Sequence, residues 1–481
     1  MRSAKPRHAT LSRSLPGSRR EFLRTASLAA AAAASGRMLP VFADVQPPQA
    51  APVAADLIPK PDRAPDYRIE IGEVDWELAP KKTVRTAAYN GQIPGQLLRL
   101  QEGRPASIEI VNRLGHAEIV HWHGQWIPPA VDGSMEEGSP MIPPAGLTRI
   151  AFTPEPSGLH WYHTHAMANR DLKHGLYSGQ FGPLYVEPRL NPGGYDREQF
   201  LTLHDWEPYY SASDDGSLMV RYGSGSINGR MLGHDTPIQV RQDQRVLFHI
   251  LNASATEPHW LTLPGHFFQV LALDGRPVPT QANVEALRLG PAERVSAVVS
   301  MNAPGVWILG EPRASFLKAG MGTVIEYAGR PGKPQSAAPA RLEWDYRVFA
   351  DPVPAIRKPD VTIPLVFTSR FQGHGALDRW MINGKSYPET EPLLLREGLR
   401  HRLVFDNRSV DDHPVHLHRH AFELVSIGGA ALSGIQKDVV IVEAGTVVEA
   451  DLVANNPGNT LFHCHQQDHM DSGFMALFRY A

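Results

Sequence analysis

Short segments in which apolar and polar residues alternate recur along the chain, and three stretches share one order of features. In each stretch an Asn-Gly pair precedes two alternating segments, and the second segment ends at another asparagine. These positions are Asn90-Gly91 with Asn112, Asn228-Gly229 with Asn252, and Asn383-Gly384 with Asn407. Alternation predicts half-buried strands, and Asn-Gly predicts tight turns between them.

The three stretches are of similar length, because the closing asparagine follows the asparagine of the Asn-Gly pair by 22, 24 and 24 positions. The pattern indicates either an internal repeat or the order of turns and strands common to β-sandwiches. Both interpretations predict an all-β chain of three sandwich domains, over residues 67–190, 191–335 and 336–481. Long helical periodicity is absent from the sequence. The Pro-rich segment Arg330–Ala340 predicts a linker before the last domain.

Composition supports an all-β protein and excludes some partners. The chain has 481 residues, of which 42 are Pro and 41 are Gly, as expected where turns are frequent. The net charge of −3 gives no indication of nucleic acid or an anionic membrane as a partner. A single cysteine excludes an internal disulfide framework.

The N-terminus has the features of an export signal. Ser18–Arg24 (SRREFLR) has a twin-arginine pattern, Ala26–Ala34 is weakly apolar, and Val41–Ala43 provides small residues for cleavage. We therefore predict a twin-arginine signal peptide over residues 1–43, followed by a Pro/Ala-rich linker over 44–66. This signal implies the Tat export machinery as a partner and a periplasmic or secreted protein with no membrane span in its mature form. The alternative is a disordered basic tail.

The stretch Leu461–Met475 (LFHCHQQDHMDSGFM) carries the strongest chemical signal. On a strand, His463 and His465 point to one face and Cys464 to the other, so one strand can serve two metal sites. His469 follows after a short loop and can reach the side of the thiolate. Thiolate and imidazole ligands suit copper or zinc. Alone, the stretch is also compatible with a zinc site or with a free cysteine among unrelated histidines.

Three further histidine clusters decide between these interpretations. Together the four clusters hold ten histidines and the cysteine, and they occur only toward the two ends of the chain. They are His121-Trp122-His123, His163-Thr164-His165, His413 with His416 and His418, and His463-Cys464-His465 with His469. Each His-x-His places two imidazoles on one face of a strand, as a shared metal requires.

The middle third of the chain lacks these clusters. Aligning His266 with His420 places Thr262 opposite His416 and Pro264 opposite His418. We therefore expect the middle domain to separate the first and third domains, which meet around the metals. His259 and His266 are then expected to be ordinary, partly buried histidines.

The four clusters resemble the four motifs of the multicopper oxidases, the family of laccases, cuprous oxidases and spore-coat oxidases. The resemblance covers the whole mature chain and is to the three-domain, laccase-like branch. It implies three tandem cupredoxin-like Greek-key β-sandwich domains and four coppers per chain. It also implies an oxidoreductase that couples four one-electron oxidations to the reduction of O2 to water.

The resemblance also implies a role for each ligand. The type 1 copper ligands are His413, Cys464 and His469, and the type 2 copper ligands are His121 and His416. The ligands of the type 3 copper pair are His123, His163, His165, His418, His463 and His465. His463 and His465 flank Cys464, so electrons can leave the sulfur toward the three-copper cluster. An all-zinc interpretation leaves this distribution unexplained, because zinc has no redox chemistry.

Two positions modify this picture. Phe474 lies where many relatives have an axial methionine, and phenylalanine cannot ligate, which predicts a higher type 1 potential, as in fungal laccases. The neighbouring Met475 is the alternative at this position, but only one of two strand neighbours can face the copper. Phe474 can also serve in core packing.

The acidic residues near the first motif are less specific. Asp132 matches an acidic residue of the family whose proposed role is to deliver protons to reduced oxygen. The alternative is a turn residue in Asp132-Gly133. Glu136 and Glu137 are expected to form a solvated acidic turn. Met470 occupies the position at which some bacterial relatives carry a second proton-transferring acid.

The reducing substrate is less well determined. There is no Met-rich insertion, and Ile435-Gln436-Lys437 lies in a short connection instead, so phenolic or aromatic amine reductants are favoured. Candidate lining residues are Trp206, Tyr209, Tyr210 and Met470, although residues of these types more often serve in simple packing. Alternatives are a periplasmic Cu(I), Mn(II) or Fe(II) oxidase and a non-enzymatic structural protein of the cell envelope.

Overall fold

The computed structural model describes residues 64–191, 193–339, 341–355 and 357–481. The predicted signal peptide over 1–43 and nearly all of the linker over 44–66 lie outside the described residues. None of the helices in the described part of the chain has the length and apolar character that crossing a membrane requires.

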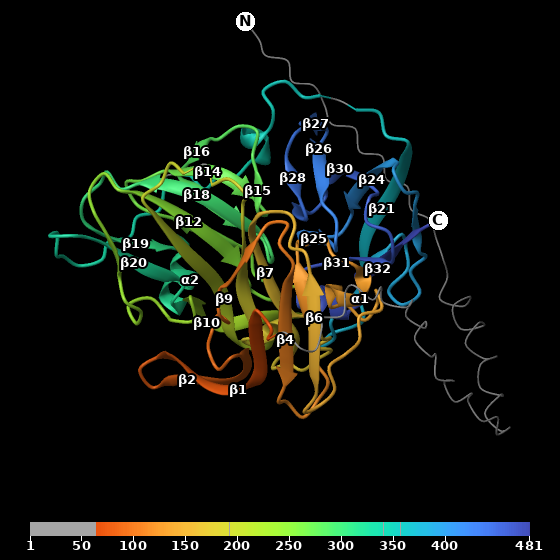
Figure 1. Ribbon diagram of the computed structural model, residues 1–481, viewed down its shortest axis with the longest axis horizontal. Helices are drawn as coiled ribbons and strands as arrows, with labels where there is room; N and C mark the ends of the chain where they lie inside the picture. Colours follow the sequence, from red (N-terminus) through yellow and green to blue (C-terminus); the bar gives the residue numbers. More distant parts are fainter. Residues whose placement is uncertain (1–63, 192, 340, 356) are drawn as a thin grey trace, which may run out of the picture. The chain divides into compact units, whose positions relative to one another are not determined.

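The first group of strands forms a sandwich of two four-stranded sheets (Figure 1). One sheet has the order β2-β1-β4-β6, from Lys82–Tyr89, Tyr67–Ala79, Ala106–Asn112 and Leu147–Phe152. The other has the order β3-β8-β7-β5, from Leu98–Gln101, Phe181–Glu187, Gly158–Thr164 and Val120–His123. Helix α1 (Pro129–Asp132) and a 3-10 turn over Gly175–Tyr177 lie in the connections.

The middle group also forms two sheets. The larger has the order β10-β9-β12-β18-β14-β15, from Leu218–Ile227, Arg197–Ala212, Arg245–Asn252, Arg294–Ser300, Phe268–Leu273 and Arg276–Pro277, with β16 (Asn283–Val284) beside β14. The smaller has the order β11-β20-β19-β13-β17, from Ile238–Val240, Gly322–Tyr327, Val306–Gly310, His259–Thr262 and Ala286–Leu289. Helix α2 spans Ala314–Ala319.

The third group repeats the strand order of the middle group. Its larger sheet is β22-β21-β24-β30-β26-β27, from Arg379–Ile382, Val361–Arg370, Arg400–Asn407, Val447–Val453, Phe422–Ile427 and Ala430–Ala431, with β28 (Gln436–Lys437) beside β26. Its smaller sheet is β23-β32-β31-β25-β29, from Leu393–Leu395, Met475–Tyr480, Thr460–Cys464, His413–Leu417 and Val439–Val442. Helix α3 spans Gln467–Asp471, and a 3-10 turn over Tyr346–Phe349 precedes the group. The predicted all-β class of three cupredoxin-like sandwiches is therefore confirmed.

The repeated asparagines explain how the strands begin and end. Asn90, Asn228 and Asn383 have positive φ angles of 54°, 52° and 52°, which asparagine tolerates better than most residues. The side-chain oxygen of each accepts a hydrogen bond from the backbone N–H of Glu70 on β1, Thr202 on β9 and Val366 on β21, at 2.6, 2.8 and 2.8 Å. Each donor lies on the first strand of the hairpin that the asparagine follows, so the repeat in the sequence reflects a repeated turn.

Buried apolar side chains join the three sandwiches. One cluster runs through the middle and third sandwiches, from Leu201 to Phe478, and another fills the first sandwich. A third cluster contains Trp161 of the first sandwich, Leu251 of the middle one and Val439 of the third. The described residues from 64 onward accordingly belong to one compact unit.

In the middle sandwich, His259 occupies the place that corresponds to His413. Thr262 of β13 pairs with Gly310, as His416 of β25 pairs with His463. By this register Glu311 corresponds to Cys464.

His259 is fully buried between two carboxylates, so the prediction of an ordinary, partly buried histidine is wrong. Its Nε2 lies 2.7 Å from Asp205, and its Nδ1 lies 3.4 Å from Glu311. The sequence could not reveal this pair, since Asp205 lies 54 residues away from His259. His266 is also more buried than predicted, at 4% exposed, and its Nε2 lies 2.6 Å from the hydroxyl of Tyr327.

We expect the His259 pair to make stability depend on alkaline pH. Burial lowers the pKa of His259, but the charge of Asp205 and hydrogen bonds to Asp205 and Glu311 outweigh it and raise the pKa to about 9. The stabilisation of the folded state by charged His259 is complete below the pKa of about 6.5 in the unfolded chain and disappears as pH rises through 9. It amounts to roughly 3 kcal/mol. His259→Gln should therefore lower the thermal midpoint at pH 6 more than at pH 9.5. Equal loss at both values would contradict this assignment.

Candidate metal centres

Eight histidines of the first and third sandwiches meet in one buried cluster. In the first sandwich His121 of β5 pairs with His163 of β7, and in the third His416 of β25 pairs with His463 of β31. Rings from the two sandwiches then stack, with centroids 3.7 Å apart for His123 and His416. The cluster comprises His121, His123, His163, His165, His416, His418, His463 and His465, each at most 8% exposed.

Most of these rings are fixed by a hydrogen bond from the nitrogen that points away from the cluster. The acceptors are backbone carbonyls or carboxylates at 2.8–3.1 Å. The bonds are His121 Nδ1 to the Asp132 carbonyl, His123 Nε2 to Asp438, His163 Nδ1 to the Thr164 carbonyl, His416 Nδ1 to the Asp438 carbonyl, His418 Nδ1 to Asp132, and His463 Nδ1 to the Cys464 carbonyl. Such bonds set the tautomer and aim the other nitrogen inward.

Most of the ring nitrogens that point into the cluster have no hydrogen-bond partner. Buried nitrogens without a partner are His121 Nε2, His123 Nδ1, His163 Nε2, His416 Nε2 and both nitrogens of His465. The Nε2 atom of His463 lies 3.4 Å from that of His165 and 3.1 Å from that of His418. Unpaired buried polar atoms are rare and costly, and metal ions would satisfy one nitrogen of each ring.

The protonation state also suits a metal. Burial and the neighbouring imidazoles lower the pKa of seven rings well below the usual value; these are His123, His163, His165, His416, His418, His463 and His465. The rings are therefore neutral and have a lone pair to donate. Donor atoms of His121, His416 and His418 lie within 4.8 Å of one another, as do those of His165, His418 and His463.

A second, smaller cluster lies on the other face of β31. The sulfur of Cys464 is 3.6 Å from Nδ1 of His413 and 3.6 Å from Nδ1 of His469, and these two nitrogens are 3.1 Å apart. Ser409 holds the outer nitrogen of His413 at 2.8 Å. Burial raises the pKa of the Cys464 thiol well above its usual range, so a metal would be needed to make it a thiolate.

Phe474 and Met475 lie in different surroundings. The Phe474 ring lies 4.7 Å from the ring of His413 and is completely buried. Met475 packs with Leu461 and Met470 in a separate apolar cluster. Phe474 is therefore the residue on the Cys464 side of the strand.

The acidic turn after α1 is solvated only in part, and the prediction of a solvated position for Glu137 is wrong. Glu137 is 5% exposed, accepts a hydrogen bond from the N–H of Leu461 at 2.6 Å, and lies 3.5 Å from Nδ1 of His418. Burial and the charge of Asp132 raise its pKa well above the usual value. The third sandwich covers this turn, which sequence alone did not reveal. Glu136 is partly exposed and accepts a bond from Ser134 at 2.9 Å.

Asp132 is fully buried at the end of α1. Its Oδ2 lies 2.8 Å from Nδ1 of His418 and 3.1 Å from Nδ1 of His121, so it contacts both histidine-bearing sandwiches. Its Oδ1 is buried and has no hydrogen-bond partner. The residue is both the end of a turn and a neighbour of the cluster.

Asp438 is a residue that sequence analysis missed. Its carboxylate accepts from His123 and its carbonyl from His416, so one residue orients ligands from two sandwiches. The signal was present in Lys437-Asp438-Val439-Val440, where two charged residues directly precede an apolar strand.

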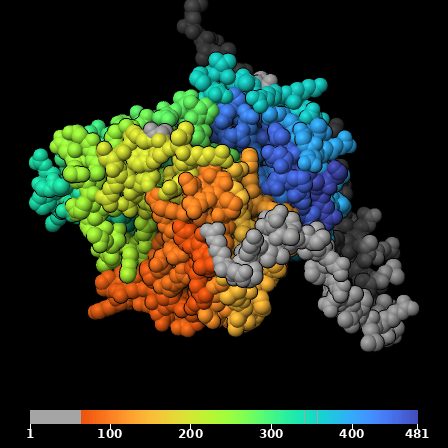
Figure 2. Space-filling view, in the orientation of Figure 1, coloured from red at the N-terminus to blue at the C-terminus, as the bar shows by residue number. Residues whose placement is uncertain are grey.

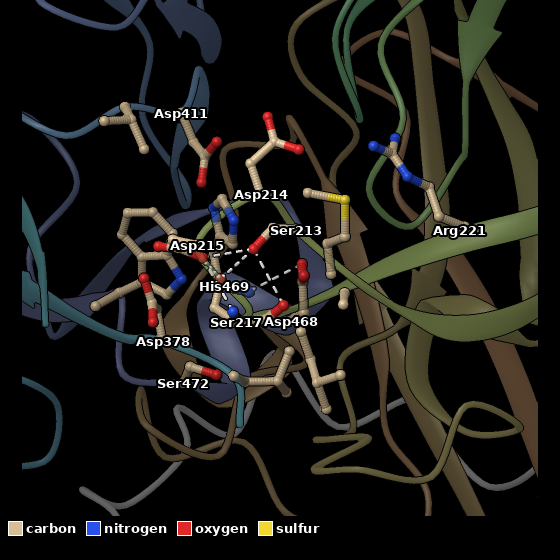
Figure 3. A pocket seen from close by; sticks show the side chains of 16 residues that line it. Ser213, Asp214, Asp215, Ser217, Arg221, Asp378, Asp411, Asp468, His469 and Ser472 are labelled. Carbon is tan, nitrogen blue, oxygen red and sulfur yellow. Dashed lines mark hydrogen bonds between the residues drawn. The ribbon is translucent and has the colours of Figure 1, made fainter. Parts of the chain in front are cut away.

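A pocket of about 450 Å³ lies beside His469 (Figure 3). Trp380, whose ring lies 4.1 Å from that of His469, forms part of its wall. Five carboxylates also line the pocket, those of Asp214, Asp215, Asp378, Asp411 and Asp468. Figure 3 shows Asp378 and Asp411 on the side of His469 and Arg221 across the view.

The predicted lining residues Trp206, Tyr209, Tyr210 and Met470 are not part of this pocket. Trp206 and Met470 are buried in apolar clusters, and Tyr209 is 52% exposed. The pocket is instead formed where the hairpin of β9 and β10 meets the third sandwich, a contact between distant parts of the chain.

The carboxylates of the pocket differ in how readily they ionise. The hydroxyl of Ser213 and the backbone and hydroxyl of Ser217 lower the pKa of Asp215 to about 2. Burial raises the pKa of Asp378, Asp411 and Asp468, that of Asp468 to about 6. The wall therefore presents more negative charge close to His469 as pH rises above these pKa values.

Two buried clusters of metal-donor side chains share strand β31, and this arrangement indicates a copper-binding oxidase. Family models described as multicopper oxidase match residues 70–191, 198–320 and 359–481. The chain is 32% identical to "Multicopper oxidase MmcO" of Mycobacterium tuberculosis, over 89% of this chain and 87% of that protein. It is 27% identical to "Laccase-4" of Thanatephorus cucumeris, over 89% and 90%.

Among solved structures, a multicopper oxidase from Pseudomonas thermotolerans matches with a TM-score of 0.69 and 26% identity, over 86% of this chain and 98% of that one. The chain belongs to the multicopper oxidase family. It is an oxidoreductase with O2 as acceptor, and its cofactor is copper, four ions per chain. The inward histidine nitrogens and the Cys464 cluster fit this cofactor.

Removing copper should destabilise the protein, because the inward imidazole nitrogens would then be buried without partners. We expect a chelated, dialysed sample to unfold about 10 °C lower than the copper-loaded protein, from the stabilisation that a tightly bound ligand confers. Differential scanning calorimetry measures this shift, and adding Cu(II) back should restore it. An unfolding midpoint that does not change when copper is added would contradict the interpretation that metal ions bind the unpaired imidazole nitrogens.

Proposed function

We propose that His413, Cys464 and His469 bind the type 1 copper, and that His121 and His416 bind the type 2 copper. His123, His163, His165, His418, His463 and His465 are then the ligands of the type 3 pair. The observation that carries this proposal is that Cys464 belongs to one cluster while its neighbours His463 and His465 belong to the other. We also propose that the three domains span residues 67–190, 191–335 and 336–481.

When bound, copper accepts electrons one at a time from a reductant and supplies four of them to dioxygen. The protein's own part is to hold and orient. Covalent bonds run without interruption from the Cys464 sulfur to the rings of His463 and His465, so three consecutive residues at the end of β31 join the two sites. Phe474 offers no donor atom to the type 1 site, which favours a high potential.

Asp132 is our candidate for proton delivery. Its free Oδ1 and its contacts to His121 and His418 support this role over that of a simple turn residue. Met470 is apolar and lies in a packing cluster, so a second relay at that position has no support.

For the reductant we propose a small aromatic amine or phenol, with preference for cationic aromatic amines. The pocket is of suitable size, has Trp380 in its wall, and carries five aspartates against one arginine. Opposite charge raises the local concentration of a cationic substrate.

A metal cation is the second candidate, because the same carboxylates favour it. Oxygen ligands suit Mn(II) or Fe(II) better than Cu(I), which prefers thioethers. One thioether, that of Met219, lines the pocket among the five carboxylates, whereas Met470 and Met475 lie outside it. Export by the twin-arginine route, and hence a periplasmic or secreted location, remains part of the proposal and is supported by Ser18–Arg24.

The first test is Cys464→Ser in the copper-loaded protein. The hydroxyl is a poor copper ligand, so copper should fall from four to three per chain. We expect the blue absorption and oxygen uptake to disappear, while His266→Gln, a control in the middle sandwich, should keep both. A colourless wild-type protein would contradict the ligand assignment. Oxygen uptake with Cu(I) but with no aromatic reductant would contradict the proposed substrate class, and uptake with Mn(II) or Fe(II) would favour the second candidate.

The second test is Asp378→Asn, assayed with aromatic reductants of different charge. Removing one partly exposed charge is worth about 1 kcal/mol, so KM for a cationic aromatic amine should rise roughly 2- to 5-fold at unchanged kcat. KM for an anionic reductant should not rise. Asp75→Asn, at a carboxylate 64% exposed on β1, is the matched control. The same KM change for cation and anion would exclude an electrostatic role for Asp378.

A further inference from the structure

Arg294, the first residue of β18, lies where the three sandwiches meet. Its side chain is completely buried. It donates to the carbonyl of Leu159 on β7 at 3.3 Å, to the carbonyls of Ala292 and Asp274 at 3.1 and 3.2 Å, and to both oxygens of Asp438 at 2.5 and 2.7 Å. One guanidinium therefore bonds to the first, middle and third sandwiches.

Asp438 carries this contact to the histidine cluster. The oxygen that accepts from Arg294 at 2.5 Å also accepts from Nε2 of His123 at 3.1 Å. The backbone carbonyl of Asp438 accepts from Nδ1 of His416. The rings of His123 and His416 are stacked, so Asp438 orients two adjacent ligands that come from different sandwiches.

Further buried charges fix the position of Arg294 and Asp438. Asp274 accepts the N–H of Arg294 at 3.0 Å and those of Asp438 and Val439 at 3.3 and 3.2 Å. Lys437 lies 3.0 Å from both Asp274 and Glu293. A carboxylate that is held on several sides cannot rotate away from His123.

The chain leaves little space around this pair. Gly124, next to His123, has φ +84°, and a Cβ there would lie 2.8 Å from both Arg294 and Asp438. Close approach of the His123 strand to the ion pair therefore requires glycine.

We propose that Arg294 is a positioning residue for the three-copper site: through Asp438 it fixes the orientation of the His123 and His416 rings. The middle sandwich, which provides no ligand, thereby takes part in building the reaction site. The inference rests on the proposed ligand assignment. Lysine cannot replace the planar fork of arginine, because it offers a single charged centre to two carboxylate oxygens.

The test is Arg294→Lys in the full-length, copper-loaded enzyme. Loss of such supporting bonds typically lowers metal affinity or activity 10- to 100-fold. We expect kcat to fall about 10-fold or more, with KM for the reductant unchanged. The type 2 EPR hyperfine splitting should change, and copper should be lost more readily on dialysis. The type 1 absorption and potential should stay as in the wild type.

Arg313→Lys is the matched control. Arg313 also belongs to the middle sandwich and pairs with Glu311 at 2.6 Å, but it has no contact with Asp438. The double variant Arg294→Met/Asp438→Asn is measured in parallel, since it removes the buried pair without leaving a lone charge.

The outcomes are distinct. Normal kcat, copper retention and type 2 spectrum in either Arg294 variant would overturn the proposal. So would failure of both to fold while Arg313→Lys folds, because Arg294 would then serve the fold alone. A wild-type protein without a type 2 signal would instead contradict the ligand assignment itself.

Discussion

The structure depends on a simple constraint: a buried imidazole has two nitrogens, and both need a partner. In the eight-histidine cluster the protein satisfies most outer nitrogens with carbonyls and carboxylates and leaves the inner ones to the metal. Four of the six outer acceptors are backbone carbonyls, and two of these, those of Thr164 and Cys464, belong to the strands that carry the histidines. The geometry of the site therefore depends directly on the course of the backbone.

Much of this could be predicted from the sequence, and the reason is periodicity. His-x-His on a strand has only one face on which to place two rings, so the four clusters predicted their own grouping. The repeated Asn-Gly pairs predicted the turns for a similar reason, because asparagine and glycine tolerate the positive φ angles found at Asn90-Gly91 and Asn228-Gly229. Such backbone preferences are visible in a short stretch of sequence.

What sequence did not predict depends on contacts between distant segments. Glu137 looked like part of a solvated turn, yet Leu461 of the third sandwich covers it. Asp438 was missed because its partners, Arg294 and His123, lie in the other two sandwiches. The pocket beside His469 was misplaced for the same reason, since its aspartates come from both the β9–β10 hairpin and the third sandwich.

The buried pair at His259 has a consequence for how the molecule responds to its surroundings. At the corresponding place in the third sandwich a bound metal would balance the Cys464 thiolate, whereas in the middle sandwich the proton on His259 lies between Asp205 and Glu311. Copper scarcity would therefore weaken the two outer sandwiches and leave the centre of the middle one intact. High pH instead removes the proton from His259 and weakens the middle sandwich, so the two conditions affect different parts of the same chain.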